Sequence, residues 1–270
     1  MAEATLETVL RRDRVVVLAA LLATTGLAWA YIVFLAVQMD MGGMDMAGFR
    51  MAATAAGMVM TPGFESWTGT EFAFTLLMWV VMMIGMMMPS AAPVILLYAR
   101  VGRQAAGEGK PFASTGWFVS GYFVAWTAFS VAATAAQWGL DRAALLTPTM
   151  ASASTLLGGI VLIAAGAYQW TSLKDRCLTQ CQSPLQFIQR SGGFRRDPFG
   201  SLRLGASHGM YCVGCCWALM TLLFVGGVMN VLWISVIAIL VLAEKVIPAG
   251  RFIGRFAGVL FILAGLQLLS

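Results

Sequence analysis

Three of the five cysteines and the only histidine of the chain occur together in the segment Ser207–Met220, SHGMYCVGCCWALM. On a helix that advances about 100° per residue, with His208 set at zero, Cys212 lies at about 40°, Cys215 at about −20° and Cys216 at about 80°. These four side chains therefore share one face. Imidazole and thiolate are soft ligands that suit Cu(I), zinc or iron–sulfur chemistry. The spacing predicts a soft-metal or redox site on this helix.

The other two cysteines, Cys177 and Cys181, lie a short distance before this segment, in KDRCLTQCQSP. If this stretch is helical, the two thiols stack one turn apart; if it is a loop, they can still bind one ion together. Because all the strongest metal ligands fall within one short span, we expect them to form one site. An odd number of cysteines cannot all pair among themselves, and a position near the cytosol favours thiols over disulfides.

Methionine is the second unusual feature, with 18 in the chain and six of them between Met78 and Met88. On a helix, Met78, Met82 and Met86 form one row, and Met83 and Met87 form a neighbouring row. Thioethers bind Cu(I) and need no deprotonation, so such rows can pass a soft ion through a membrane. The alternative is that these side chains are adaptable packing material.

A third group of soft donors lies in the stretch MDMGGMDM, between the first two apolar segments. Its methionines alternate with aspartates at spacings that suit flexible capture of Cu(I) outside the membrane; they are Met39, Met41, Met44 and Met46. The alternative is an ordinary mobile loop without a binding role.

The elements that position these residues are long apolar segments. The chain has 270 residues, of which 60% are hydrophobic and only 11% charged, with a mean hydropathy of +0.82, and its apolar runs are long enough to cross a bilayer. We therefore predict an all-α, polytopic transmembrane bundle of about seven helices, forming a single domain over residues 1–270. The predicted segments are Val15–Gln38, Glu71–Tyr98, Phe112–Trp138, Ala151–Leu173, His208–Val228, Val231–Glu244 and Phe252–Leu269.

The basic residues give a consistent topology. With the N-terminus in the cytosol, only Arg50 and Arg142 of the 17 Lys and Arg fall on the outer side, a strong positive-inside bias. Residues 39–70 then form a methionine-rich outer loop, and residues 174–207 form a cysteine-containing cytosolic loop. The net charge of +5 thus reflects topology, and nucleic-acid binding is not indicated. Glu244 and Lys245 are predicted to be an interfacial pair with a snorkelling lysine.

Several stretches resemble a bacterial family known only as predicted metal-binding integral membrane proteins, a domain of unknown function. The resemblance rests on MMIGMMMPSAAP, YQWTSLKDRCLTQCQSP, HGMYCVGCCWALM and LAEKVIPAG, and it extends from about Glu71 onward. It implies metal binding and a multi-pass location in the bacterial inner (cytoplasmic) membrane. It does not name the metal or the reaction.

The leading hypothesis is Cu(I) transport or delivery, in which the outer methionines collect the ion, the rows between Met78 and Met87 relay it, and the cysteine–histidine site receives it. Zinc or another soft metal is the alternative cargo. The expected partners are the metal ion, membrane lipid, and a metallochaperone or larger membrane complex.

Two other classes of function stay open. One is a membrane thiol oxidoreductase or metal-cofactor assembly factor, with Cys215 and Cys216 or Cys177 and Cys181 as its redox pair; the other is an accessory subunit of a larger complex. No phosphate-binding loop, nucleophile elbow or carboxylate dyad is present in the sequence, and no catalytic residue is predicted. Whether the protein is an enzyme is left open.

Overall fold

The structure, a computed structural model, describes residues 2–41, 49–54, 57–62, 67–109, 111–147 and 150–270, with the side chains of residues 1–14 and 38–66 outside the description. Its elements are α1 (Ala2–Met41), β1 (Phe49–Thr54), β2 (Gly57–Pro62), α2 (Gly69–Gly107), α3 (Thr115–Arg142), α4 (Thr155–Tyr168), α5 (Ser172–Gln182), α6 (Pro184–Arg190), α7 (Pro198–Thr221), α8 (Leu223–Gly226), α9 (Val231–Val246) and α10 (Gly250–Leu269).

The predicted polytopic helical bundle is confirmed. Among the described residues, five helical stretches are long and apolar enough to cross a membrane: Val15–Val37, α2, α3, Pro198–Gly226 and α10. The pair α4 and α5 is bent by 64° and would count as a sixth span if the two helices act together. The described part of the chain therefore has five or six candidate spans, against the predicted count of about seven. The difference arises because the fourth predicted segment breaks into two helices and α9 has only 16 residues.

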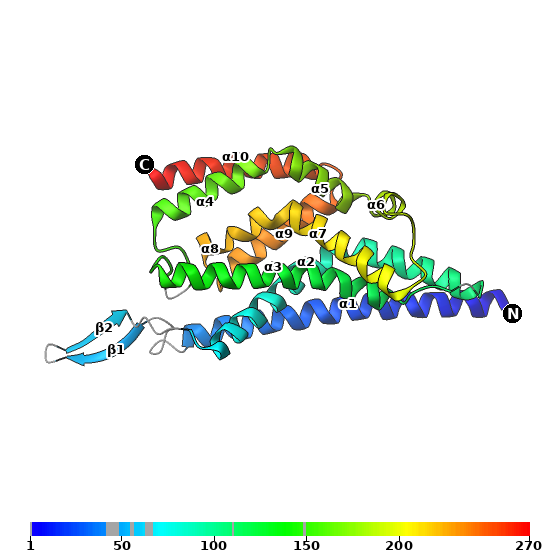
Figure 1. Ribbon diagram of the computed structural model, residues 1–270, viewed down its shortest axis with the longest axis horizontal. Coiled ribbons are helices and arrows are strands. Elements are labelled where there is room, and N and C mark those ends of the chain that lie inside the picture. The colour runs from blue at the N-terminus through cyan, green and yellow to red at the C-terminus, as the bar shows by residue number, and fades with distance from the viewer. Residues whose placement is uncertain (1, 42–48, 55–56, 63–66, 110, 148–149) are drawn as a thin grey trace.

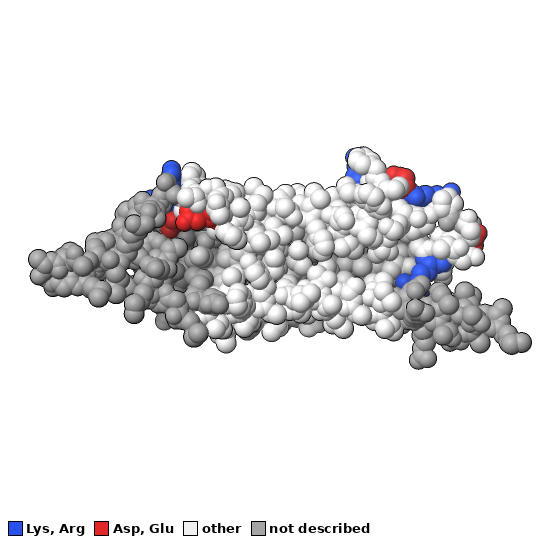
Figure 2. All heavy atoms as spheres, turned by 90° about the horizontal axis from the view of Figure 1, so that it is seen from below, with Lys and Arg blue, Asp and Glu red and all other residues white. Residues whose placement is uncertain are grey.

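The helices form an elongated bundle (Figure 1). Helix α1 runs along one edge, α4 and α10 lie side by side along the opposite edge, and α7 and α9 lie between them. The antiparallel pair β1–β2 extends beyond one end, and the N-terminus lies at the other. In the view of Figure 2, the visible charged side chains gather at the two ends and leave an uncharged belt between them. Such a belt is the surface that a bilayer covers.

Glycine allows the central helices to approach each other closely. A Cβ added to Gly205 of α7 would collide with the backbone carbonyl of Phe118 on α3, and one added to Gly121 would collide with that of Leu202. Helices α4 and α10 meet in the same way, since a Cβ on Gly265 would lie 2.8 Å from the carbonyl oxygen of Gly159. Small residues that permit close backbone contact are the usual means of helix association in membranes.

The start of α7 differs from the prediction. The carboxylate of Asp197 caps the helix by accepting from the backbone N–H of Gly200, and Pro198 occupies the first turn. Both are strong start signals, so the polar stretch before His208 is already helical. At 1.5 Å per residue, His208 lies about 15 Å along the axis. The predicted helix start at His208 is therefore wrong.

The segment 174–207, predicted as a cytosolic loop, contains α5, α6 and the start of α7. Helix α4 ends at the bend, and the side chain of Thr171 accepts from the backbone N–H of Lys174 to begin α5. The two cysteines of this segment therefore lie on a helix, one turn apart. Turn-like composition after Ser183 obscured the short helices, which tertiary packing stabilises.

Candidate metal centre

The four residues predicted to share one face of α7 are all buried in the bundle. His208 is 3% exposed, Cys212 2%, Cys215 1% and Cys216 0%. All five cysteines of the chain are free thiols. Three thiols within two turns of a buried helix supply soft donors at a depth that water does not reach freely.

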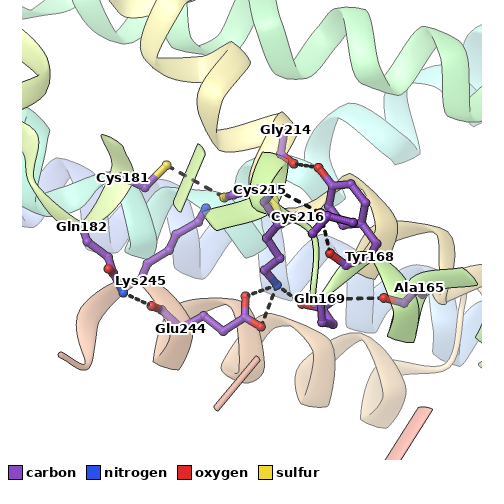
Figure 3. Close-up of polar contacts among 12 residues, drawn as sticks. Ala165, Tyr168, Gln169, Cys181, Gln182, Gly214, Cys215, Cys216, Glu244 and Lys245 are labelled. Atoms are coloured by element: carbon purple, nitrogen blue, oxygen red, sulfur yellow. Dashed lines mark hydrogen bonds and ion pairs between the residues drawn. The ribbon is translucent and has the colours of Figure 1, made fainter. Parts of the chain in front are cut away.

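Helix α5 brings the second cysteine pair against this face. The Sγ atom of Cys181 lies 3.9 Å from that of Cys215 (Figure 3). Cys177, one turn earlier on α5, is buried against α7 beside Gly214. The predicted convergence of the two cysteine groups is thus present, although direct sulfur contacts involve Cys181 rather than Cys177.

The methionine rows of α2 meet the same cluster. Met87 Sδ lies 4.0 Å from Cys216 Sγ, so the end of one predicted row touches the predicted receiving site. The methionines predicted to relay the ion lie in the core with exposures between 0% and 8%; they are Met78, Met82, Met83, Met86 and Met87. Met86 also lines a cavity of about 320 Å³ beside Pro89.

Polar groups fix the orientation of the thiols. The carbonyl oxygen of Cys212 accepts from Cys215 Sγ at 3.1 Å and from Cys216 Sγ at 2.9 Å. The hydroxyl oxygen of Tyr122, on α3, lies 3.1 Å from Cys212 Sγ. Cys212 is therefore the centre of the cluster, because it links the other thiols to α3 as well as to each other.

His208 lies one turn before Cys212, in an aromatic enclosure. Its ring centroid lies 4.9 Å from that of Phe187, 6.0 Å from that of Tyr122 and 6.2 Å from that of Phe118. Its Nδ1 atom is buried and has no hydrogen-bond partner within the described part of the chain. The imidazole thus keeps a buried nitrogen without a partner among the described residues, one helical turn before Cys212.

Buried charges surround the cluster, which corrects one prediction. Glu244 and Lys245 are not an interfacial pair, because they are only 1% and 7% exposed. The Glu244 carboxylate accepts from Lys174 Nζ at 2.8 and 2.9 Å (Figure 3), and Gln169 accepts from the same ammonium. Lys245 Nζ instead points to Cys212 Sγ, at 2.9 Å. Glu244 thus binds Lys174 on α5, whereas the neighbouring Lys245 binds Cys212 on α7.

The donors meet in pairs rather than as a preformed cage. Within the described residues, no group of three or more His, Cys, Asp and Glu side chains is arranged to hold a metal ion. The two close sulfur pairs are Cys181 with Cys215 and Cys216 with Met87. Two sulfurs bound at about 2.3 Å to one tetrahedral ion would be separated by about 3.8 Å. The observed separations of 3.9 and 4.0 Å are close to this value.

The methionines predicted to capture the ion on the outer side lie in the part of the chain whose side chains are not described. Met44 and Met46 lie outside the described residues, and the side chains of Met39 and Met41, at the end of α1, also lie outside the description. Their proposed role stays a prediction.

Sequence reasoning missed three contributors to the site. They are Tyr122, Ser90, whose Oγ accepts from Lys245 Nζ at 3.2 Å, and the buried Lys245 itself. The position of Lys245 at the end of an apolar segment indicated either an interfacial or a functional residue, because charged residues inside membrane segments are usually functional. Only the packing of α9 against α2 and α7 separates these two cases. The hydroxyl groups of Tyr122 and Ser90 carry no distinctive spacing.

The fold and the cluster define a class of protein: a helical bundle with membrane-crossing helices and a buried set of soft sulfur donors. A family model described as PpoB2: Copper chaperone matches residues 76–268. The chain therefore belongs to this family. The matched range covers α3 to α9 and all the predicted cysteine, histidine and helix-2 methionine positions. No curated protein and no solved structure matches the chain.

Proposed function

We propose that the protein binds Cu(I) inside the membrane and passes it along sulfur donors to the cysteine cluster for delivery. The observation that carries this proposal is the 4.0 Å contact between Met87 Sδ and Cys216 Sγ. It joins the thioether rows of α2 to the thiols of α7. Without this contact, the methionines and the cysteines would be two separate features with separate explanations.

Sulfur chemistry gives the proposed path its direction. Thioethers bind Cu(I) without releasing a proton, whereas thiolates bind it more strongly. An ion that reaches Met87 therefore gains affinity when it moves to Cys216 and then to Cys212, Cys215 and Cys181. With the N-terminus in the cytosol this route leads inward. Sites made of few ligands suit an ion that must leave as well as enter.

The binding residues that we propose are Cys181, Cys212, Cys215, Cys216 and Met87. Cys177 and His208 are further candidates, because each lies one turn from this group on the same helix face. The copper is cargo in this scheme, and the receiving metalloprotein or complex is its destination. Membership in a family described as copper chaperones supports copper over zinc.

Copper titration tests the proposal. The parental protein in detergent should bind about one tightly held Cu(I) per chain, and the double variant Cys212→Ser/Cys215→Ser should lose most of it, because serine is a much poorer soft-metal ligand. Ala218→Ser is the matched control, since it places a hydroxyl at another buried position of α7 without removing sulfur. Unchanged copper content in the double variant would reject the proposed site.

The methionine path needs a separate test of movement. Met82→Leu/Met86→Leu roughly conserves volume, so folding should cost less than about 1.5 kcal/mol per site, while Cu(I) uptake into proteoliposomes should fall. Met220→Leu is the control, because Met220 is equally buried but lies outside the rows. Uptake at the parental rate in the double variant would mean that the methionines only pack the core.

Thiol redox chemistry is a second candidate function. The 3.9 Å separation of Cys181 and Cys215 sulfurs favours it, because a modest approach would allow a disulfide between α5 and α7. Thiol titration of the purified protein separates the candidates: five reduced thiols that copper protects favour Cu(I) handling, and a reversible loss of two thiols without copper favours redox chemistry.

A further inference from the structure

Lys245 lies in an unusual place for an ammonium group. It belongs to the last turn of α9 and is only 7% exposed. Its Nζ atom donates to Cys212 Sγ at 2.9 Å and to Ser90 Oγ at 3.2 Å, and lies 3.9 Å from Met87 Sδ. A thiol, a thioether and a hydroxyl from α7 and α2 therefore surround one positive charge.

No carboxylate in the described part of the chain forms an ion pair with this ammonium group. Glu244, the adjacent residue, is occupied by Lys174, from which it accepts two hydrogen bonds. Within the described chain, Lys245 forms no ion pair with an acidic side chain. Burial of an unpaired cation is expensive, so the sulfur of Cys212 is the group that stabilises it.

The donors around the ammonium are the donors of the proposed copper site. Cys212 is the centre of the thiol cluster, and Met87 is the contact between the methionine rows and the cysteines. A copper ion that binds Cys212 on the side facing Met87 would meet Lys245 Nζ, which lies 2.9 Å from Cys212 Sγ and 3.9 Å from Met87 Sδ. Two cations cannot share that space, because their repulsion is strong in an environment of low dielectric constant.

We propose that Lys245 is a resident cation that competes with Cu(I) for Cys212 and Met87, and that copper binds by displacing the ammonium group. This inference rests on the proposed function, and adds to it the means of release. When the ion departs, the ammonium returns and stabilises the emptied sulfur site. The flexible four-carbon stem of lysine lets the ammonium group move away from Cys212 while it keeps Ser90 Oγ, now at 3.2 Å, as its acceptor.

Competition with the ammonium group makes Cu(I) easier to release, which a delivery protein requires. A cluster of four thiols would otherwise hold Cu(I) too firmly to give it up. A hydrogen bond that involves a charged group is worth more than a neutral one, and copper must replace that bond when it binds. Lys245 thus lowers the affinity of the site for Cu(I) and speeds the release of the ion.

The test compares the release of Cu(I) from the full-length parental protein, Lys245→Leu and Lys245→Arg to an excess of a Cu(I) chelator. Leucine carries neither a charge nor a sulfur atom, so Lys245→Leu should bind Cu(I) about tenfold more tightly and release it about tenfold more slowly. Lys245→Arg keeps a cation and should release copper several-fold faster than Lys245→Leu. Weaker binding or parental release in Lys245→Leu would overturn the inference and would mean that Lys245 helps to hold the sulfurs.

A measurement on the unaltered protein covers the case in which Lys245→Leu folds poorly. The side-chain nitrogen NMR signal of Lys245, assigned by its loss in Lys245→Arg, should shift when Cu(I) is added. A signal that does not move while copper binds would overturn the inference alone. Failure of the parental protein to bind Cu(I) at all would overturn the proposed function and this inference with it.

Discussion

The substitution Glu244→Gln removes the carboxylate that pairs with Lys174 and leaves a buried ammonium without its counter-charge. Both side chains are almost fully enclosed, at 2% and 1% exposure, and their charged atoms lie 2.8 Å apart. Breaking a buried pair by removing one partner costs about 3–5 kcal/mol. We expect Glu244→Gln, and likewise Lys174→Met, to lower the free energy of unfolding by about this amount.

The double variant Lys174→Met/Glu244→Gln gives the sharper result. With both charges removed, no unpaired ion stays buried, so the loss should be much smaller than the sum of the two single losses. The assay is denaturant unfolding of the purified protein in detergent, followed by tryptophan fluorescence. Losses that simply add in the double variant would refute the argument that these charges stabilise each other.

A more exposed ion pair, between α5 and α10, serves as the control. Asp175 and Arg255 lie 2.9 Å apart, but their side chains are 26% and 44% exposed. Water screens such a pair, so Arg255→Gln should cost less than about 1 kcal/mol. If Arg255→Gln costs as much as Glu244→Gln, burial is not the cause of the effect.

Two further predictions concern packing and topology. Gly205→Ala should destabilise the protein by at least about 1–3 kcal/mol, because the added Cβ meets the α3 backbone, whereas Gly107→Ala should be neutral, since no atom lies within 4 Å of its Cβ; equal thermal stability of both variants would contradict the close α3–α7 contact. Reporter fusions at Gly107 and Gly43 should report the cytosol and the outer side respectively. A cytosolic signal at Gly43 would reverse the topology and the direction of the proposed route.

The sequence predicted the bundle well because a bilayer imposes simple requirements on length and hydropathy. The helix boundaries that the sequence did not predict depend on local capping signals and on tertiary packing. Helix α7 begins at Pro198 because Asp197 and Pro198 form a local start signal inside a polar stretch, and a search for apolar runs passes over such signals. The break between α4 and α5 depends on packing around Gln169 and Lys174, which no local pattern reveals.

The candidate site could be predicted in part for a similar reason. Helical spacing alone placed Cys212, Cys215 and Cys216 on one face, because periodicity determines which side chains share a face. The contacts of Cys181 with Cys215 and of Met87 with Cys216 join different helices. Lys245 was assigned to the interface, because its neighbours in the sequence do not reveal that α2 and α7 enclose it.

X-ray absorption at the copper edge of the Cu(I)-loaded protein tests the central claim most directly. The account predicts a first shell of sulfur at about 2.2–2.3 Å, and loss of the bound copper in Cys212→Ser/Cys215→Ser. A first shell of nitrogen and oxygen, or a sulfur shell that is unchanged in the double variant, would contradict the assignment of the site to this cluster.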